Sequence, residues 1–289
     1  QASKLYRNVI IGRNAVSQYT GGDDIHRNVI IGYNAGYKLG RYASNNVIIG
    51  NEAMDGGSTT VGAQEQLSDN IAIGKYALQN VKTNSNNNIV MGQEAAQNAG
   101  TGSGTYSNWS HNIAIGQRCL RDATGGSDNM VAVGHNCLEY HTGDGDGSSG
   151  GYTVAYGNSA FRNNRHIRHS VALGNSAGSD WNPAKGNLHE GGSTFVGGGA
   201  GRTCSTGASL IAIGRDALSG GGPCTGTYNT AIGSRCYERI SSGSHNVAVC
   251  GLYGGLFVST GDYNNFFGSL AGYAYDVNNA TATGDHNNI

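Results

Sequence analysis

Two glycine-rich segments have spacings that occur at catalytic and phosphate-binding sites. Residues 174–178 read Gly-Asn-Ser-Ala-Gly, the G-x-S-x-G spacing of a nucleophile elbow, in which a serine attacks an acyl group. The same positions one repeat earlier, residues 157–161, read Gly-Asn-Ser-Ala-Phe, so the match follows from a repeated sequence. Residues 197–201, Gly-Gly-Gly-Ala-Gly, have the glycine content of a phosphate loop but lie on the same repeat and open no predicted helix. From these motifs we predict no catalytic residues and no enzyme activity.

Two polar clusters contain side chains that bind metal ions in other proteins. Residues 144–147, Asp-Gly-Asp-Gly, offer oxygen ligands suited to Ca²⁺, but the later Asx and Glu of a calcium loop are absent. His166 and His169 flank a basic stretch that contains Arg165 and Arg168, without the cysteine or carboxylate neighbours of a metal site. We therefore predict no metal site and no cofactor, and we interpret the arginines as a polar surface able to touch an anionic glycan.

Large aromatic residues stand out in otherwise small and polar connecting segments. They are Tyr106, Trp109, Tyr152 and Trp181. Tryptophan in such a loop often stacks on a sugar ring while its N–H bonds a hydroxyl group. With Arg165 and Arg168, these four residues are the predicted contacts to a glycan or receptor. The alternative, that each ring packs as a lid over the adjacent repeat, stays open.

The six cysteines fall at different positions of the repeat. Cys119, Cys137 and Cys236 occupy a position that is otherwise small, where a thiol acts as a slightly larger alanine, and we expect them to be buried and reduced. Cys204 and Cys224 lie in connectors of neighbouring repeats and are a possible disulfide. Cys250 takes the place of a repeated glycine, for which the sequence offers no explanation.

All of these residues belong to one repeat that runs along the chain, Asn-Φ-Φ-Φ-Gly-x-x-Ala, where Φ is apolar. Successive motif glycines are 17 to 24 residues apart. Copies start near residues 8, 28, 46, 70, 88, 112, 130, 153, 170, 193, 210, 229, 246 and 264, and a truncated copy starts at 287. Such periodicity predicts a single repeat domain over residues 1–289: an all-β parallel β-solenoid, or β-roll, with one strand per repeat.

The three apolar positions of each motif predict two buried faces. Alternate strand residues point to the same side, so Val29 and Ile31 share one face while Ile30 faces the other. Both faces are apolar, and a strand that is apolar on both faces is covered on both. We predict that the first and third positions line the coil interior and that the middle position packs against other copies of the chain. The predicted interface residues are Ile10, Ile30, Ile48, Val90, Phe195 and Phe266.

Composition and charge exclude several classes of partner. The 289-residue chain carries a formal net charge of -1 and only 13% charged residues, which gives no basis for binding nucleic acid or an anionic membrane. It also lacks the run of about 18 apolar residues that a transmembrane helix needs. We therefore expect neither nucleic-acid binding nor membrane insertion.

The motif resembles that of a known group of surface proteins. Asn-Val-Ile-Ile-Gly-x-x-Ala, with Thr-Gly-x-x-Asn connectors at 225–229 and 260–264, is similar to the head repeats of trimeric autotransporter adhesins and to the repeat regions of phage tail fibres. The resemblance implies a homotrimer with apolar residues along the threefold axis and a role in adhesion. The repeats of 17 to 24 residues are longer than those of the adhesin heads, so the shape of the rung can differ from theirs. Six cysteines are unusual for an autotransporter, which favours the tail fibre.

The expected function is that of a structural and adhesive fibre segment on the outside of a virion or cell. Its predicted partners are two further copies of itself and a glycan or protein receptor on a host surface, contacted through the insertion loops. The alternative is a self-assembling extracellular filament without a receptor. A depolymerising enzyme would need paired carboxylates at a groove, and the sequence offers no convincing pair.

Overall fold

The protein is described here by a computed structural model. It describes residues 5–18, 25–39, 43–56, 67–81, 85–100, 109–124, 127–142, 151–165, 167–182, 192–220, 224–256 and 258–273. In these residues every regular element is a β-strand. Contacts within the chain divide it into two compact units, residues 1–152 and 153–289.

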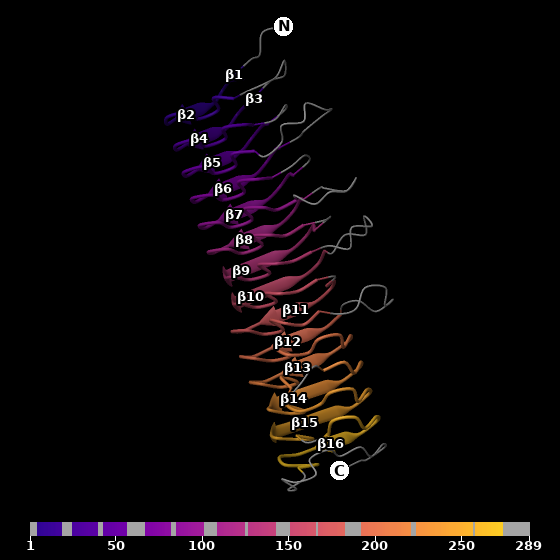
Figure 1. Ribbon diagram of the computed structural model, residues 1–289. Coiled ribbons are helices and arrows are strands. Elements are labelled where there is room, and N and C mark those ends of the chain that lie inside the picture. Colours follow the sequence, from indigo (N-terminus) through magenta and orange to yellow (C-terminus); the bar gives the residue numbers. More distant parts are fainter. Residues whose placement is uncertain are drawn as a thin grey trace. The chain divides into compact units, whose positions relative to one another are not determined.

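The first unit stacks its strands in chain order. Its elements are β1 (Leu5–Tyr6), β2 (Val9–Ile11), β3 (Ile25–His26), β4 (Val29–Ile31), β5 (Val47–Ile49), β6 (Ile71–Ile73), β7 (Ile89–Met91), β8 (Ile113–Ile115) and β9 (Val131–His135). Strands β2 and β4 to β9 form a parallel stack, and the short β1 pairs with β3 (Figure 1). Each strand of the stack belongs to one sequence repeat.

The second unit repeats the arrangement. Its strands are β10 (Val154–Asn158), β11 (Val171–Leu173), β12 (Thr194–Val196), β13 (Ile211–Ile213), β14 (Thr230–Ser234), β15 (Val247–Leu252) and β16 (Asn265–Phe267). Consecutive strands again pair in parallel. The predicted all-β parallel β-solenoid, with one strand per repeat, is confirmed.

The motif glycine follows the three apolar strand positions and lets neighbouring rungs approach closely. Gly50 has φ +144°, a conformation that L side chains rarely adopt, and a Cβ added to it would overlap the carbonyl of Gly74 in the next rung. The strands before the glycines are in register, with Val47 opposite Ile71 and Ile49 opposite Ile73. Equivalent residues therefore lie directly above one another from rung to rung.

The structure reverses the predicted roles of the two strand faces. The middle-position residues Ile30, Ile48, Val90, Phe195 and Phe266 are buried inside the coil of a single chain, so the prediction that they form an interface between chains is wrong. Ile10, on the first described rung of the stack, is 38% exposed.

The physical reason for this reversal lies in the turn after each glycine. The chain folds back at the glycine, and the residues after it cover the middle position. A Cβ at Gly201 would overlap the ring of Phe195, which shows how closely the returning backbone approaches that ring. The apolar residues needed to cover the middle position are therefore supplied by the rung itself.

The motif asparagine forms a ladder inside each unit. Asn28, Asn46, Asn70, Asn88 and Asn112 are buried, and the Oδ1 atom of each accepts the backbone N–H of the equivalent residue in the next rung. In the second unit Asn229, Asn246 and Asn264 repeat this pattern. Because a buried polar group is costly unless it is hydrogen-bonded, the ladder fixes the stacking of the rungs.

Candidate functional site: the outer face of the strands

The first and third strand positions lie on the outside of each unit and carry mainly apolar side chains. We call them the outer-slot face. In the first unit it comprises Val29, Ile31, Val47, Ile49, Ile71, Ile73, Ile89, Met91, Ile113, Ile115, Val131 and Val133, and in the second Val154, Tyr156, Val171, Leu173, Thr194, Val196, Ile211, Ile213, Thr230, Ile232, Val247 and Val249. All are half-buried or exposed in the isolated chain. The expectation that these positions form the interior is wrong.

The outer-slot face is apolar on a scale that a solvated surface rarely shows. Ile211 and Ile213 are each 38% exposed, and Tyr156 is 59% exposed. Neighbouring strands lie about 4.8 Å apart, so the six consecutive strands of each unit present this surface over roughly 24 Å. Large contiguous apolar patches on soluble proteins mark interaction sites. Parallel sheets are also covered on both faces in most proteins.

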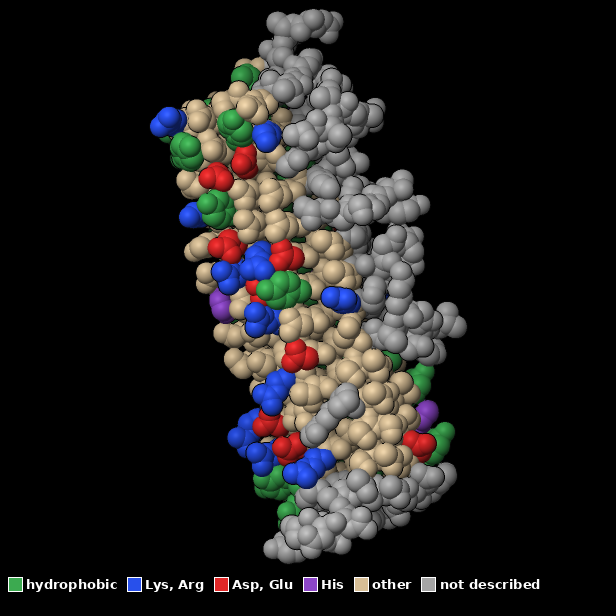
Figure 2. Space-filling view, viewed as in Figure 1, with side chains coloured by type: hydrophobic (Ala, Val, Ile, Leu, Met, Phe, Trp, Pro, Cys, Tyr) green, Lys and Arg blue, Asp and Glu red, His purple; other side chains and the backbone are tan. Residues whose placement is uncertain are grey.

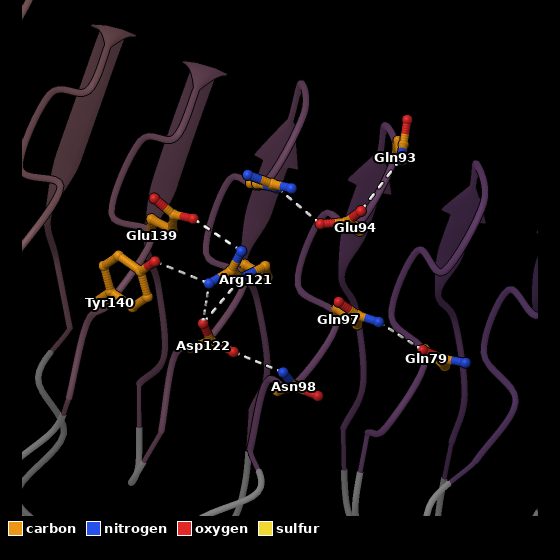
Figure 3. A network of polar contacts seen from close by, with 10 residues as sticks. Gln79, Gln93, Glu94, Gln97, Asn98, Arg121, Asp122, Glu139 and Tyr140 are labelled. Carbon is orange, nitrogen blue, oxygen red and sulfur yellow. Dashed lines mark hydrogen bonds and ion pairs between the residues drawn. The ribbon is translucent and has the colours of Figure 1, made fainter.

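A different surface of the first unit is polar, and hydrogen bonds and ion pairs connect its side chains from rung to rung (Figure 3). The guanidinium group of Arg121 contacts Asp122 at 2.8 Å and Glu139 at 3.0 Å, and it donates a hydrogen bond to the Tyr140 hydroxyl at 3.0 Å. The Nδ2 atom of Asn98 donates to Oδ1 of Asp122 at 2.6 Å. The two carboxylates thus share one guanidinium, an arrangement that ties neighbouring rungs together.

The same surface continues through uncharged amides and a second ion pair. Gln97 donates to Oε1 of Gln79 in the preceding rung at 2.8 Å. Arg118 donates to Glu94 at 2.8 Å, and this hydrogen bond holds the pKa of Glu94 below its ordinary value. On the face seen in Figure 2, acidic and basic side chains of the described residues are interspersed. This mixture of signs agrees with the net charge near zero.

The predicted tryptophan contacts are wrong. Trp109 and Trp181 are both 0% exposed. The indole N–H of Trp181 donates to the carbonyl oxygen of Gly207 at 2.6 Å, and its ring packs edge-on against Phe195 with centroids 5.3 Å apart. Both rings therefore belong to the core, which agrees with the alternative that each ring packs against the adjacent repeat. Neither ring presents a surface to a sugar.

The other predicted contacts belong to both units or lie outside the described residues. Tyr152 is 61% exposed in the first unit, and in the second unit Arg165 is exposed and Arg168 half-buried. Tyr106 lies outside the described residues, as do the acidic segment 144–147 and His166. Contact of these residues with a glycan or receptor therefore stays a prediction.

An exposed aromatic stack was missed by the sequence analysis. The rings of Tyr228 and His245 are stacked with centroids 5.0 Å apart, and those of His245 and Tyr263 with centroids 4.8 Å apart. Each residue directly precedes a motif asparagine and has a positive φ. The signal was the recurrence of a ring at this position in three successive repeats.

The cysteines differ in part from the expectation. Cys236 and Cys250 form a disulfide with Cα atoms 6.6 Å apart, so the prediction of a reduced Cys236 is wrong. Cys119 and Cys137 are buried and are not joined by a disulfide, as expected. Cys204 and Cys224 are also buried and free, but they lie opposite each other in neighbouring rungs.

Cys250 is an inserted residue rather than a substitute for the motif glycine. The register between β14 and β15 shifts there, so that Ser234 pairs with Leu252. Gly254 then occupies the position that holds a small residue in the other repeats. Its carbonyl oxygen accepts the backbone N–H of Tyr237 at 2.9 Å. The insertion turns the Cys250 side chain towards Cys236 in the preceding rung.

Comparison with protein-family models, curated proteins and solved structures finds no significant match. Among the described residues, no three His, Cys, Asp or Glu side chains are grouped so as to hold a metal ion. The same part of the chain contains no helix with the length and apolar character to cross a membrane. The outer-slot face is thus the strongest candidate for a functional surface.

Proposed function

We propose that the chain is a structural segment of a homotrimeric surface fibre, in which the outer-slot faces of three copies pack against one another. The observation that carries this proposal is that both strand faces are apolar, whereas the chain itself covers only the face of the middle position. A stable interface buries about 800 Å² on each partner, and a sheet face two side chains wide over several strands is of that order. The number three comes from the resemblance of the motif to trimeric fibres.

The sequence itself supplies a conservative way to test this surface. Thr194 and Thr230 occupy outer-slot positions, so threonine is compatible with the strand. Replacing Ile211 and Ile213 by threonine lowers the apolar area without disturbing the buried middle position. The matched control replaces both by valine, which keeps the surface apolar.

The experiment is the native mass of the three proteins by light scattering over a range of concentrations. The wild type and the valine variant are expected near three times 29.8 kDa. The threonine variant is expected to dissociate at higher concentration than either. A monomeric wild type at every concentration would contradict the proposal, and a mass that grows without limit would favour the filament alternative.

The adhesive part of the proposed function needs exposed side chains that contact a host glycan or protein receptor. The stacked rings of Tyr228, His245 and Tyr263 suit this role better than the buried tryptophans, because Tyr228 is 41% and Tyr263 is 48% exposed. Stacked rings offer apolar faces and polar edges of the kind that bind sugars. Binding to immobilised glycans should weaken in a Tyr228→Ala, Tyr263→Ala variant of unchanged mass, and equal binding would exclude this surface.

A location outside the cell is part of the same proposal. The Cys236–Cys250 disulfide supports it, because disulfides persist mainly in oxidising compartments.

A further inference from the structure

The six cysteines are arranged as three pairs, and the two members of each pair lie in neighbouring rungs of one unit. Cys236 and Cys250, already bonded, are 14 residues apart in the sequence. The other four are Cys119 and Cys137 in the first unit and Cys204 and Cys224 in the second. No cysteine is left without a partner in the adjacent rung.

Cys119 and Cys137 occupy the small position of consecutive repeats. The backbone N–H of Leu120 donates to the carbonyl oxygen of Cys137 at 3.0 Å, which places the two residues one rung apart. The Cys119 Sγ atom points along the stack and donates to the carbonyl oxygen of Gly134 at 3.1 Å. A rung step of about 4.8 Å falls within the Cα separation of roughly 4.4 to 6.8 Å that disulfides span.

Cys204 and Cys224 face each other across a parallel bridge. The backbone N–H of Ser205 donates to the carbonyl oxygen of Cys224 at 3.0 Å. Both side chains are fully buried. A hydrogen bond between the two thiols, together with burial, raises the pKa of Cys204 above its ordinary value.

We propose that Cys119–Cys137 and Cys204–Cys224 close as disulfides in an oxidising compartment and, with Cys236–Cys250, tie three pairs of neighbouring rungs covalently. The oxidant is a small-molecule disulfide such as oxidised glutathione. One cysteine thiolate attacks it, forms a mixed disulfide and releases one glutathione thiol. The second cysteine thiolate then displaces the other glutathione, so that two electrons pass from the pair to the oxidant.

The closure takes place before the rungs are fully packed. A thiolate is the reacting species. A hydrogen bond with Cys137, together with burial, raises the pKa of the folded Cys119 thiol far above its ordinary value. These two pairs therefore react during folding, and the packed protein keeps whichever redox state it acquired.

The first test counts thiols in protein refolded with a glutathione redox buffer, denatured in acid-quenched urea and then titrated with a thiol reagent. The inference predicts no reactive thiol among the six cysteines, with peptide mapping that joins 119 to 137 and 204 to 224. Four reactive thiols would leave Cys236–Cys250 as the sole bond and would overturn the inference. Disulfides between chains on a non-reducing gel would also overturn it.

The matched variant is Cys137→Ala, because alanine fills the same position at Ala53, Ala77 and Ala95. It is expected to fold, to show the single thiol of Cys119, and to lose less thermal stability than the wild type when reductant is present during refolding. Equal losses in the two proteins would count against the Cys119–Cys137 bond. The thiol count does not depend on the mass of the assembly, so this test and that of the proposed trimer fail separately.

Discussion

The Oδ1 atom of Asn46 accepts two hydrogen bonds from Asn70 in the next rung, one from its backbone N–H at 3.0 Å and one from its side-chain Nδ2 at 3.1 Å. The Nδ2 atom of Asn46 donates in turn to the carbonyl oxygen of Leu67 at 2.6 Å. One buried amide therefore joins a strand, its successor and a connecting segment. The repeat keeps asparagine here because its side chain both accepts and donates.

Replacing Asn46 by alanine is expected to lower the free energy of unfolding by about 2 to 4 kcal/mol, since buried groups of Asn70 and Leu67 lose their partners. Asn46→Ser should cost less, because Ser193 occupies the same position and its Oγ accepts the N–H of Leu210 at 3.0 Å. Urea denaturation measures both. The control is Asn51→Ala, on an exposed turn residue. Equal effects of Asn46→Ala and Asn51→Ala would contradict the role of the ladder.

A second prediction concerns the close approach of the rungs at the motif glycine. Gly50→Ala should destabilise the protein by more than about 3 kcal/mol, because its Cβ would overlap the Gly74 carbonyl and its φ is +144°. Gly198→Ala is the control, since nothing lies within 4 Å of a Cβ at that position and its φ is not positive. Thermal denaturation of the two variants checks the difference. A Gly50→Ala protein as stable as Gly198→Ala would show that the rungs can separate at little cost.

The sequence predicted the stacking of the rungs because motif spacing alone determines it. It did not predict which strand face is the interior, since both faces are apolar. A signal was present in side-chain volumes. Phe266 in the middle position is followed by Gly272 four residues after the motif glycine, whereas Ala72 is followed by Leu78 at the equivalent place. A large residue opposite a small one indicates that the two share a core.

The tryptophans were misassigned because they border polar insertions, whereas their position in the repeat predicts burial. Trp181 lies seven residues after its motif glycine, as do the buried Leu39 and Val81. Trp109 lies three residues before its motif asparagine, as do Ile25 and Leu67. The motif could not predict the disulfide between Cys236 and Cys250, because this bond depends on a one-residue insertion that shifts the strand register.

The corrected interior leads to a third prediction. Phe195 packs against Phe161 and Trp181, with ring centroids 5.9 and 5.3 Å away. Phe195→Ala is expected to lower the free energy of unfolding by about 3 to 5 kcal/mol through the cavity it leaves. The milder Phe195→Leu should keep the fold and leave the native mass by light scattering unchanged. A Phe195→Leu protein that is equally stable but dissociated would instead return this residue to an interface between chains.

The fourth prediction uses the pH dependence of stability at Asp128. Its Oδ1 accepts the backbone N–H of Ser110 at 2.6 Å, and Asn86 accepts the N–H of Ser68 in the same way at 2.8 Å. Burial raises the pKa of Asp128 above its ordinary value, although the hydrogen bond from Ser110 and the charge of His111 oppose this. The carboxyl group therefore ionises more readily in the unfolded chain. Its contribution to stability is complete below the unfolded pKa of about 3.9 and is lost as the pH rises through the folded pKa.

Asp128→Asn removes this loss of stability with rising pH. It keeps a side-chain oxygen that can accept the backbone N–H, as the one of Asn86 does in the equivalent position. The variant should be more stable than the wild type at pH 7, by up to about 1 kcal/mol for a half-buried group, and the difference should vanish near pH 3. Denaturation by urea at both pH values measures it. Asp180→Asn, on an exposed carboxylate, is the control and should change stability by less than about 0.5 kcal/mol. If Asp128→Asn were less stable than the wild type at pH 7, the negative charge would be favourable at this site, and burial would not be the dominant influence on Asp128.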